Sequence, residues 1–153
     1  MELHEFDEKF RELYTNMVEI AYEYVNRNRD EVDDIFIFGA IGDGNFSYHV
    51  FYKINGKMVE IHQLNRVSKQ QYDLSDNRTF KLQDLGNDYL EKIAALFKSD
   101  NRPVPTDLKM IYSPKTGKFT NSIGYDSHFY EEGQKFVSVV YNEWFVEMGG
   151  KLD

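Results

Sequence analysis

The sequence lacks cysteine, long apolar runs, internal repeats and low-complexity segments. The absence of cysteine excludes disulfides and thiolate-ligated metal sites. A membrane-spanning helix needs about 20 consecutive, mostly apolar residues, and no run approaches that length. The N-terminal segment MELHEFDEKF has neither the basic start nor the apolar stretch of a signal peptide. We therefore expect a cytoplasmic protein that has no membrane partner.

Several enzyme motifs are also missing. The glycine-rich segment 39–44 (GAIGDG) follows one predicted strand and leads into another, so no helix N-terminus is available there to hold a phosphate. No serine stands in a G-x-S-x-G setting. Asp126, Ser127 and His128 are consecutive, and adjacent residues cannot adopt the geometry of a catalytic triad. These absences predict a protein that is not an enzyme and that has no cofactor.

The length and composition indicate one folded domain. At 153 residues the chain is long enough to bury a substantial hydrophobic core. Hydrophobic residues make up 41% of the chain and aromatic residues 16%, which argues against disorder. We therefore expect a single domain over residues 1–153.

Negative charge is concentrated near the N-terminus. The net charge is −8, and residues 1–34 contain eleven acidic and four basic side chains, so the rest of the chain is nearly neutral. An acidic field repels nucleic acid and attracts basic partners. We therefore expect a protein partner and no nucleic acid. The simpler interpretation of the same charges is a solvated helix face that keeps the protein soluble.

Apolar residues at helical spacing predict three helices. The first covers residues 5–28. The second begins at Asp84, a favourable N-cap residue, and ends near Lys98. The third runs from about residue 130 to 148, and its wide aromatic stripe indicates packing against a sheet. Gly149 and Gly150 then end it, as glycines commonly do beyond a helix C-terminus.

The remaining regular segments have strand-like patterns. They cover residues 35–41, 45–54, 57–64, 108–112 and 118–125, and a short strand at 79–82 stays open. Asn55-Gly56 is a strong signal for a tight hairpin turn. We therefore predict an α+β fold. In it an antiparallel sheet, a three-stranded meander plus a second hairpin, packs in two layers against N-terminal, middle and C-terminal helices.

The Asn55-Gly56 turn also predicts a register. A two-residue loop pairs Tyr52 with Val59, and it places His49 opposite His62 on the other face. Two histidines across a strand pair could share a metal ion, with Glu60 as a third ligand, so a metal-dependent hydrolase is an alternative function. A closed zinc site needs four ligands, however, and a diagonal Glu60 is poorly placed. The favoured interpretation is a half-exposed polar and aromatic face without a metal.

The most informative segment is residues 105–145. Strand-like residues 108–112 lead into the turn Ser113-Pro114-Lys115-Thr116-Gly117, then a second strand that ends in Tyr125-Asp126, then the aromatic helix. This S-x-K-T-G-K-F turn, the Y-D ending and the following helix resemble the YezG-like family of small bacterial immunity proteins. Members of that family neutralise nuclease toxins deployed against neighbouring bacteria, many of them LXG-type toxins. The resemblance implies a single YezG-like immunity domain whose partner is a cognate, basic nuclease toxin.

An acidic inhibitor gains association rate and specificity against a nuclease, because a nuclease presents a basic surface to its substrate. Carboxylates and exposed aromatic residues are therefore the predicted partner-binding groups. The predicted partner-binding residues are Asp30, Glu31, Asp33, Asp34, Asp43, Tyr125, Asp126, Glu131 and Glu132. Tyr125 and Asp126 belong to the family motif, whereas the others follow from charge and expected exposure. A housekeeping protein-binding module without a toxin partner stays open, and the aromatic content leaves room for a homodimer.

Overall fold

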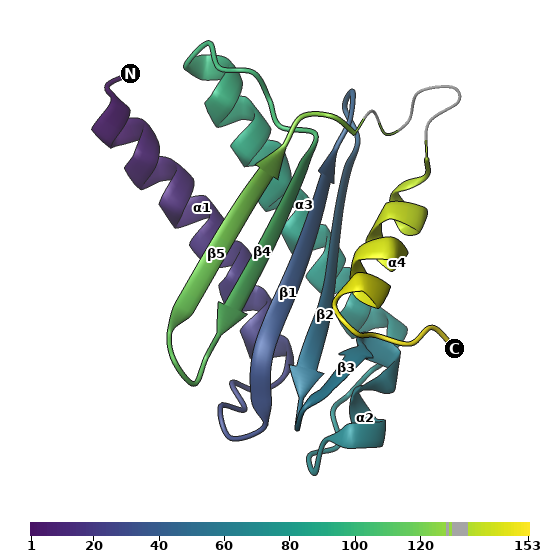
Figure 1. Ribbon diagram of the computed structural model, residues 1–153. Helices are drawn as coiled ribbons and strands as arrows, with labels where there is room; N and C mark the ends of the chain where they lie inside the picture. The colour runs from purple at the N-terminus through teal and green to yellow at the C-terminus, as the bar shows by residue number, and fades with distance from the viewer. Residues whose placement is uncertain (128, 130–134) are drawn as a thin grey trace.

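The computed structural model describes residues 1–127, 129 and 135–153, and within them it shows an antiparallel sheet of five strands between helices (Figure 1). The strands are β1 (Val32–Ile41), β2 (Phe46–Ile54), β3 (Lys57–Glu60), β4 (Asp107–Ser113) and β5 (Lys118–Gly124), in the order β3-β2-β1-β4-β5. The predicted meander and second hairpin are both present. The second hairpin pairs with β1, so the first strand of the meander becomes the centre of the sheet.

Helices cover both faces of the sheet, which makes three layers where the sequence predicted two. Helices α1 (Leu3–Tyr24) and α3 (Asp76–Ser99) pack on one face, and α4 (Val137–Glu147) lies on the other (Figure 1). The physical reason lies in the central strand β1, whose residues are buried on both faces from Ile35 to Ile41. A continuous apolar run of this kind is typical of a strand with both faces covered.

The larger core lies between the sheet and helices α1 and α3. Tyr48 and Tyr52 of β2 are fully buried there, and their hydroxyl groups donate hydrogen bonds to the backbone carbonyls of Met17 and Ala21, at 2.8 and 2.7 Å. Gly86 of α3 lies against the Tyr48 ring, where an added Cβ would approach ring atoms to 2.0 Å. Glycine is therefore required at this crossing of helix and strand.

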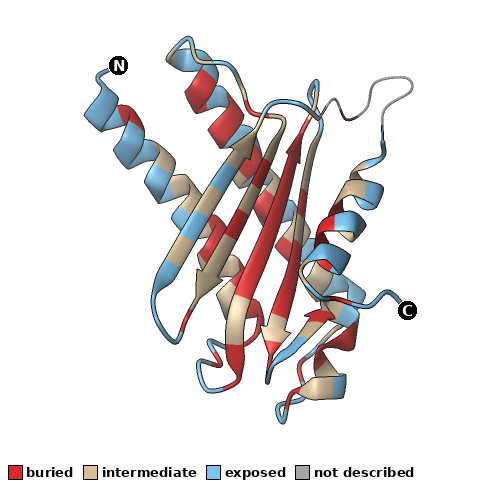
Figure 2. Cartoon of the chain, viewed as in Figure 1, coloured by how far each residue is buried: buried red, intermediate tan, exposed pale blue. Residues whose placement is uncertain are grey.

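The second core is smaller and almost wholly aromatic. Its sheet side is formed by Phe36, Phe38 and Phe51, and α4 covers them with Trp144 and Phe145. Figure 2 shows that α4, which contains both buried and exposed residues, lies beside the buried central strands. Phe36 and Phe51 stack across neighbouring strands, with ring centroids 4.5 Å apart. The wide aromatic stripe of the last helix is thus core packing, as the sequence predicted.

Three helices end in the same way. After α1, α3 and α4 the chain takes a positive φ at Asn26, Asn101 and Gly149, and the next residue donates a hydrogen bond to the carbonyl five positions earlier. This pair of features is the Schellman motif, which satisfies carbonyls that the helix leaves unpaired. The first helix accordingly ends at Tyr24, four residues before the predicted end.

The Asn55-Gly56 register is confirmed, because Tyr52 pairs with Val59 and Phe51 with Glu60. The predicted continuation of the third strand to residue 64 is wrong. Residues Ile61–Gln63 form a 3₁₀ turn (η1), followed by the short helix α2 (Leu64–Val67). Glu60 and Gln63 form a reciprocal capping box that turns the chain away from β2. His49 and His62 therefore do not pair across strands.

The second long helix begins at Asp76, so both the strand at 79–82 and the N-cap at Asp84 were wrong predictions. Contacts to the end of α1 stabilise the extra turns. Arg78 donates a 2.6 Å hydrogen bond to the carbonyl of Tyr24, and its guanidinium lies over the Tyr24 ring. The Thr79 and Tyr24 hydroxyl groups form a hydrogen bond with each other. Such contacts between distant segments override a weak local pattern.

Candidate functional site

The predicted partner-binding residues lie at two opposite ends of the sheet. We call the end of β1 at Val32 the lower end and the end at Ile41 the upper end, as oriented in Figure 1. At about 3.3 Å per residue the two ends are about 30 Å apart. The lower end carries Asp30, Glu31, Asp33 and Asp34, and the upper end carries Asp43, Tyr125 and Asp126. Glu131 and Glu132 lie outside the described residues.

Glu31 is buried, with 7% of its surface exposed, so its expected exposure was wrong. Its carboxylate accepts hydrogen bonds from the side chains of Asn28, Asn55 and Ser68 and from the backbone N–H of Lys69, at 2.6 to 2.9 Å. Burial opposes ionisation, but these four bonds outweigh it and lower the pKa of Glu31 to about 2. Glu31 therefore joins β1, the β2–β3 turn and the segment after α2.

Asp33 and Asp34 are half-buried and are also engaged within the chain. Asp33 lies 2.7 Å from the Lys115 ammonium and accepts a hydrogen bond from the Gly56 N–H at 2.8 Å. Although burial raises the pKa of Asp33, these two contacts, together with the nearby charge of Lys53, bring it below its ordinary value. Asp34 accepts a short hydrogen bond from the Ser113 hydroxyl. Of the lower-end residues only Asp30 is fully exposed.

The upper end differs in that its predicted residues are exposed. Asp43 lies in the β1–β2 turn, and Tyr125 and Asp126 directly follow β5, with Tyr125 46% exposed. Backbone hydrogen bonds link Ile41 to Thr106 and Thr106 to Gly124, both at 2.9 Å, so these segments leave the sheet at the same level. They are two strand spacings apart, about 10 Å. Within the described residues, the three side chains form no hydrogen bond or ion pair.

The histidines of the hydrolase alternative occupy different surroundings. His49 is half-buried beside the Tyr141 ring, and burial lowers the pKa of His49. His62 is exposed, with its Nε2 2.8 Å from Asp153 and its Nδ1 3.8 Å from Glu60. Both border a hollow of about 370 Å³. In residues 1–127, 129 and 135–153, no group of three His, Asp or Glu side chains is placed to hold a metal ion.

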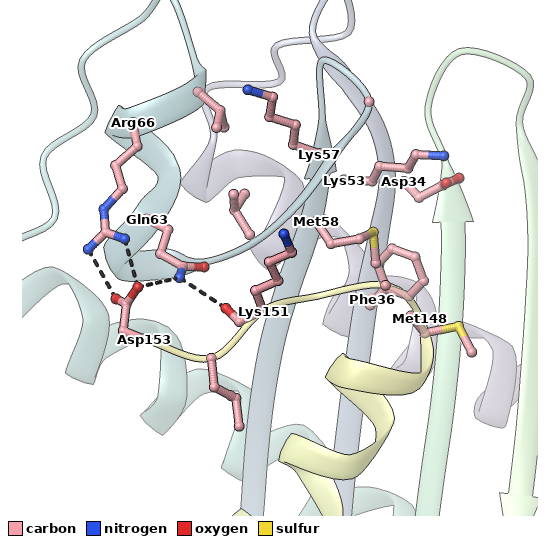
Figure 3. Close-up of a pocket in the computed structure, with 15 residues that line it drawn as sticks. Asp34, Phe36, Lys53, Lys57, Met58, Gln63, Arg66, Met148, Lys151 and Asp153 are labelled. Atoms are coloured by element: carbon pink, nitrogen blue, oxygen red, sulfur yellow. Dashed lines mark hydrogen bonds and ion pairs between the residues drawn. The ribbon is translucent and has the colours of Figure 1, made fainter.

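A larger groove of about 760 Å³ lies at the lower end, on the face that α4 only partly covers (Figure 3). Its floor contains Phe36, Met58 and Met148. Its rim carries Lys53, Lys57, Lys151 and Arg66, together with Asp34 and Asp153. We call this hollow the cationic groove, because basic side chains outnumber acidic ones there in a chain of net charge −8.

One wall of the cationic groove is the segment after α4. Gly149 has a φ of 108°, and a Cβ on Gly150 would meet the Phe145 ring at 2.4 Å, so the two glycines let the chain turn closely past the helix end. The segment is held at Asp153, where Arg66 donates two hydrogen bonds of 2.8 and 3.0 Å (Figure 3). Gln63 adds a third at 3.2 Å.

Neither the cationic groove nor the role of Glu31 was predicted from the sequence. The residues that build each of them come from segments far apart in the chain, so no local motif marks them. Asn28 and Ser68 are polar residues beside predicted loops, and only the fold shows that both face one carboxylate. Near the groove, the spacing of Glu60 and Gln63 is a local sequence signal, because these residues form the capping box that ends β3.

Comparison with known proteins adds no assignment. No protein-family model matches the chain, and no curated protein matches it. None of the helices in the described part of the chain combines the length and apolar character needed to cross a membrane. The candidate site thus depends on the geometry above and on the motif in residues 105–145.

Proposed function

We propose that this protein is a non-catalytic immunity protein, acting in the cytoplasm, that binds a positively charged nuclease toxin and blocks it. The observation that carries the proposal is the upper acidic surface, formed by Asp43, Tyr125 and Asp126. These residues are exposed, and in the described part of the chain their side chains form no hydrogen bond or ion pair. Tyr125 and Asp126 also end the motif that resembles YezG-like immunity proteins.

The chemistry of the upper acidic surface suits such a partner. Unpaired carboxylates attract a basic surface and raise the association rate, and an exposed tyrosine supplies apolar area with a polar tip. A stable complex buries about 800 Å² on each partner. The surface must therefore extend beyond three residues, and the outer face of α1 carries further exposed acids, among them Glu8 and Glu12.

The lower end contributes less under this proposal. Glu31 is inaccessible, and Asp33 and Asp34 already accept hydrogen bonds from the chain itself. A partner that engaged Asp33 or Asp34 would have to displace Lys115 or Ser113 first. Asp30 is the one lower-end candidate that is exposed without a side-chain contact in the described residues.

Co-expression tests the proposal. The chain is produced in bacteria together with the nuclease toxin encoded beside its gene, and growth is measured. We expect the natural sequence to restore growth and the Asp43→Lys/Asp126→Lys variant to lose protection, with the toxin association rate falling about tenfold or more at low salt. Asp88→Lys is the matched control, since Asp88 is an exposed carboxylate on α3.

Two results would contradict the proposal. One is failure of the natural chain to protect against the neighbouring toxin. The other is full protection by the double variant together with unchanged association kinetics across a salt series. A pull-down that recovers only a partner without nuclease activity would favour the housekeeping protein-binding module.

A further inference from the structure

The cationic groove lies where the sheet face that carries α4 is not covered by the helix. Helix α4 is 11 residues long and ends above Phe36 and Met58, so it does not reach the lower end of β1 and β2. The chain then crosses toward α2 and forms the opposite wall (Figure 3). The result is a hollow of about 760 Å³ with a defined floor and walls.

The lysines around the groove form no direct ion pair in the described residues, although Lys53 is close enough to Asp33 to lower the pKa of that carboxyl. Arg66 is paired with Asp153, and Asp34 accepts a hydrogen bond from Ser113. Lys53, Lys57 and Lys151 form no ion pair or hydrogen bond through their side chains in the described part of the chain. The three ammonium groups border the same hollow, so they attract an anion that enters it.

The floor of the groove is apolar and adaptable. Phe36 is packed on Phe51 and presents little free surface, so it closes the bottom without offering a ring for stacking. Met58 and Met148 are partly exposed beside it. Methionine side chains are flexible and polarisable, and they adjust to ligands of irregular shape.

The wall of the groove already binds a carboxylate. Asp153 is held by the bidentate Arg66 contact, and by Gln63, whose side chain is buried with 6% exposure and therefore fixed in place. His62 Nε2 lies 2.8 Å from the same carboxylate. These contacts hold the Lys151 segment over the groove, so the third lysine is positioned by the fold.

We propose that the cationic groove binds a small organic anion with an apolar body. The anionic group lies among Lys53, Lys57 and Lys151, and the apolar body contacts Met58 and Met148. The volume is within the range of about 300–1,000 Å³ typical of small-molecule sites. A nucleic acid fits less well, since a chain of net charge −8 repels a polyanion at long range. The inference is independent of the proposed toxin partner.

The test uses anilinonaphthalene sulfonate, an anion with an aromatic body whose fluorescence rises in apolar surroundings, added to the folded full-length chain. We expect saturable binding at one site, with the Met58 and Met148 methyl signals shifting in the NMR spectrum during titration. Decanoate should compete for the site, whereas inorganic phosphate should not. Near-ultraviolet circular dichroism verifies that the protein stays native throughout.

Variants distinguish binding in the cationic groove from non-specific binding of the dye elsewhere on the protein. Lys53→Gln/Lys151→Gln should weaken binding about tenfold, equivalent to about 1.4 kcal/mol. Lys69→Gln/Lys118→Gln, two exposed lysines outside the groove, should leave the affinity unchanged. Equal affinity in both double variants would overturn the proposal, and so would methyl signals of Met58 and Met148 that stay in place while the dye binds.

Discussion

The two ends of the sheet use their carboxylates in different ways. At the lower end Glu31, Asp33 and Asp34 accept hydrogen bonds from the chain itself, and the most buried of them holds three segments together. At the upper end Asp43 and Asp126 are exposed, and their side chains form no hydrogen bond or ion pair in the described residues. Acidic residues that look alike in the sequence therefore divide into structural groups and groups available to a partner.

Uncharged hydrogen-bond donors determine the role of an acidic residue as much as its position in the sequence does. In the part of the chain that the structure describes, Glu31 has no cationic partner. Its ionised form is favoured by four donors, three of them on the uncharged side chains of Asn28, Asn55 and Ser68. A carboxylate that accepts several such bonds is held ionised and fixed. Among the described residues no such donor bonds to Asp43 or Asp126, so their charge remains available.

The largest expected effect comes from Glu31→Gln. The new amide NH₂ would face donors, and the remaining amide oxygen cannot satisfy them all, so we expect a loss of about 3 kcal/mol in the free energy of unfolding. Urea unfolding followed by circular dichroism measures it. Glu12→Gln, on the exposed face of α1, is the control and should change stability by less than about 0.5 kcal/mol. Equal urea midpoints for Glu31→Gln and Glu12→Gln would contradict the structural role assigned to Glu31.

The same carboxylate gives a pH dependence. The pKa of Glu31 is about 2 in the folded chain against an ordinary 4.5, so its contribution is fully present above pH 4.5 and is lost as pH falls toward 2. The unfolding free energy of the natural chain should therefore fall more steeply over this window than that of Glu31→Gln. Parallel curves for the two proteins would contradict the assigned role.

A smaller effect is expected from Asp33→Asn. The substitution removes an ion pair with Lys115 that is only partly shielded from solvent, and the Gly56 N–H keeps an amide oxygen as acceptor. We expect a loss of about 0.5–1 kcal/mol, diminishing at high salt. Thermal unfolding at two ionic strengths measures both features, and a loss that is independent of salt would argue against the ion pair as the cause.

The smallest expected effect is at the upper end. Asp43→Asn should leave the unfolding free energy within about 0.5 kcal/mol of the natural chain, because the side chain is exposed and has no hydrogen bond or ion pair to lose in the described residues. Its effect should show only in the association rate with a basic partner. A clear loss of stability would place Asp43 with the structural acids and weaken the case for an upper acidic surface.

Local signals in the sequence predicted much of the fold. Asn55-Gly56 fixed the β2–β3 register, and Pro114 with Gly117 marked the β4–β5 turn, because these residues favour particular turn conformations. Spacing of apolar residues found α1 and α4. The position of α4 on the second face was missed, although the unbroken apolar run at Ile35–Ile41 is the pattern of a strand covered on both sides.

The candidate site was predicted less completely. Asp43 was predicted from its charge and expected exposure, and Tyr125 and Asp126 from the motif at 105–145. The burial of Glu31, in contrast, depends on donors from three separate segments. Likewise Lys53 and Lys151 are almost a hundred positions apart in the sequence, and they border one groove because α4 ends before it covers the lower end of the sheet. The distribution of charge along a sequence does not show which distant residues border the same groove.

The tyrosine pair of β2 has a consequence for how this chain tolerates insertions. Tyr48 and Tyr52 donate hydrogen bonds to backbone carbonyls that are four residues apart on α1, which is about 6 Å along a helix. Along the strand the two tyrosines are about 13 Å apart, so the rings must lean toward each other to reach their acceptors. One residue added between Met17 and Ala21 would turn the second acceptor by about 100° and disengage it. Length changes in homologous chains should therefore avoid this stretch and gather in the loops.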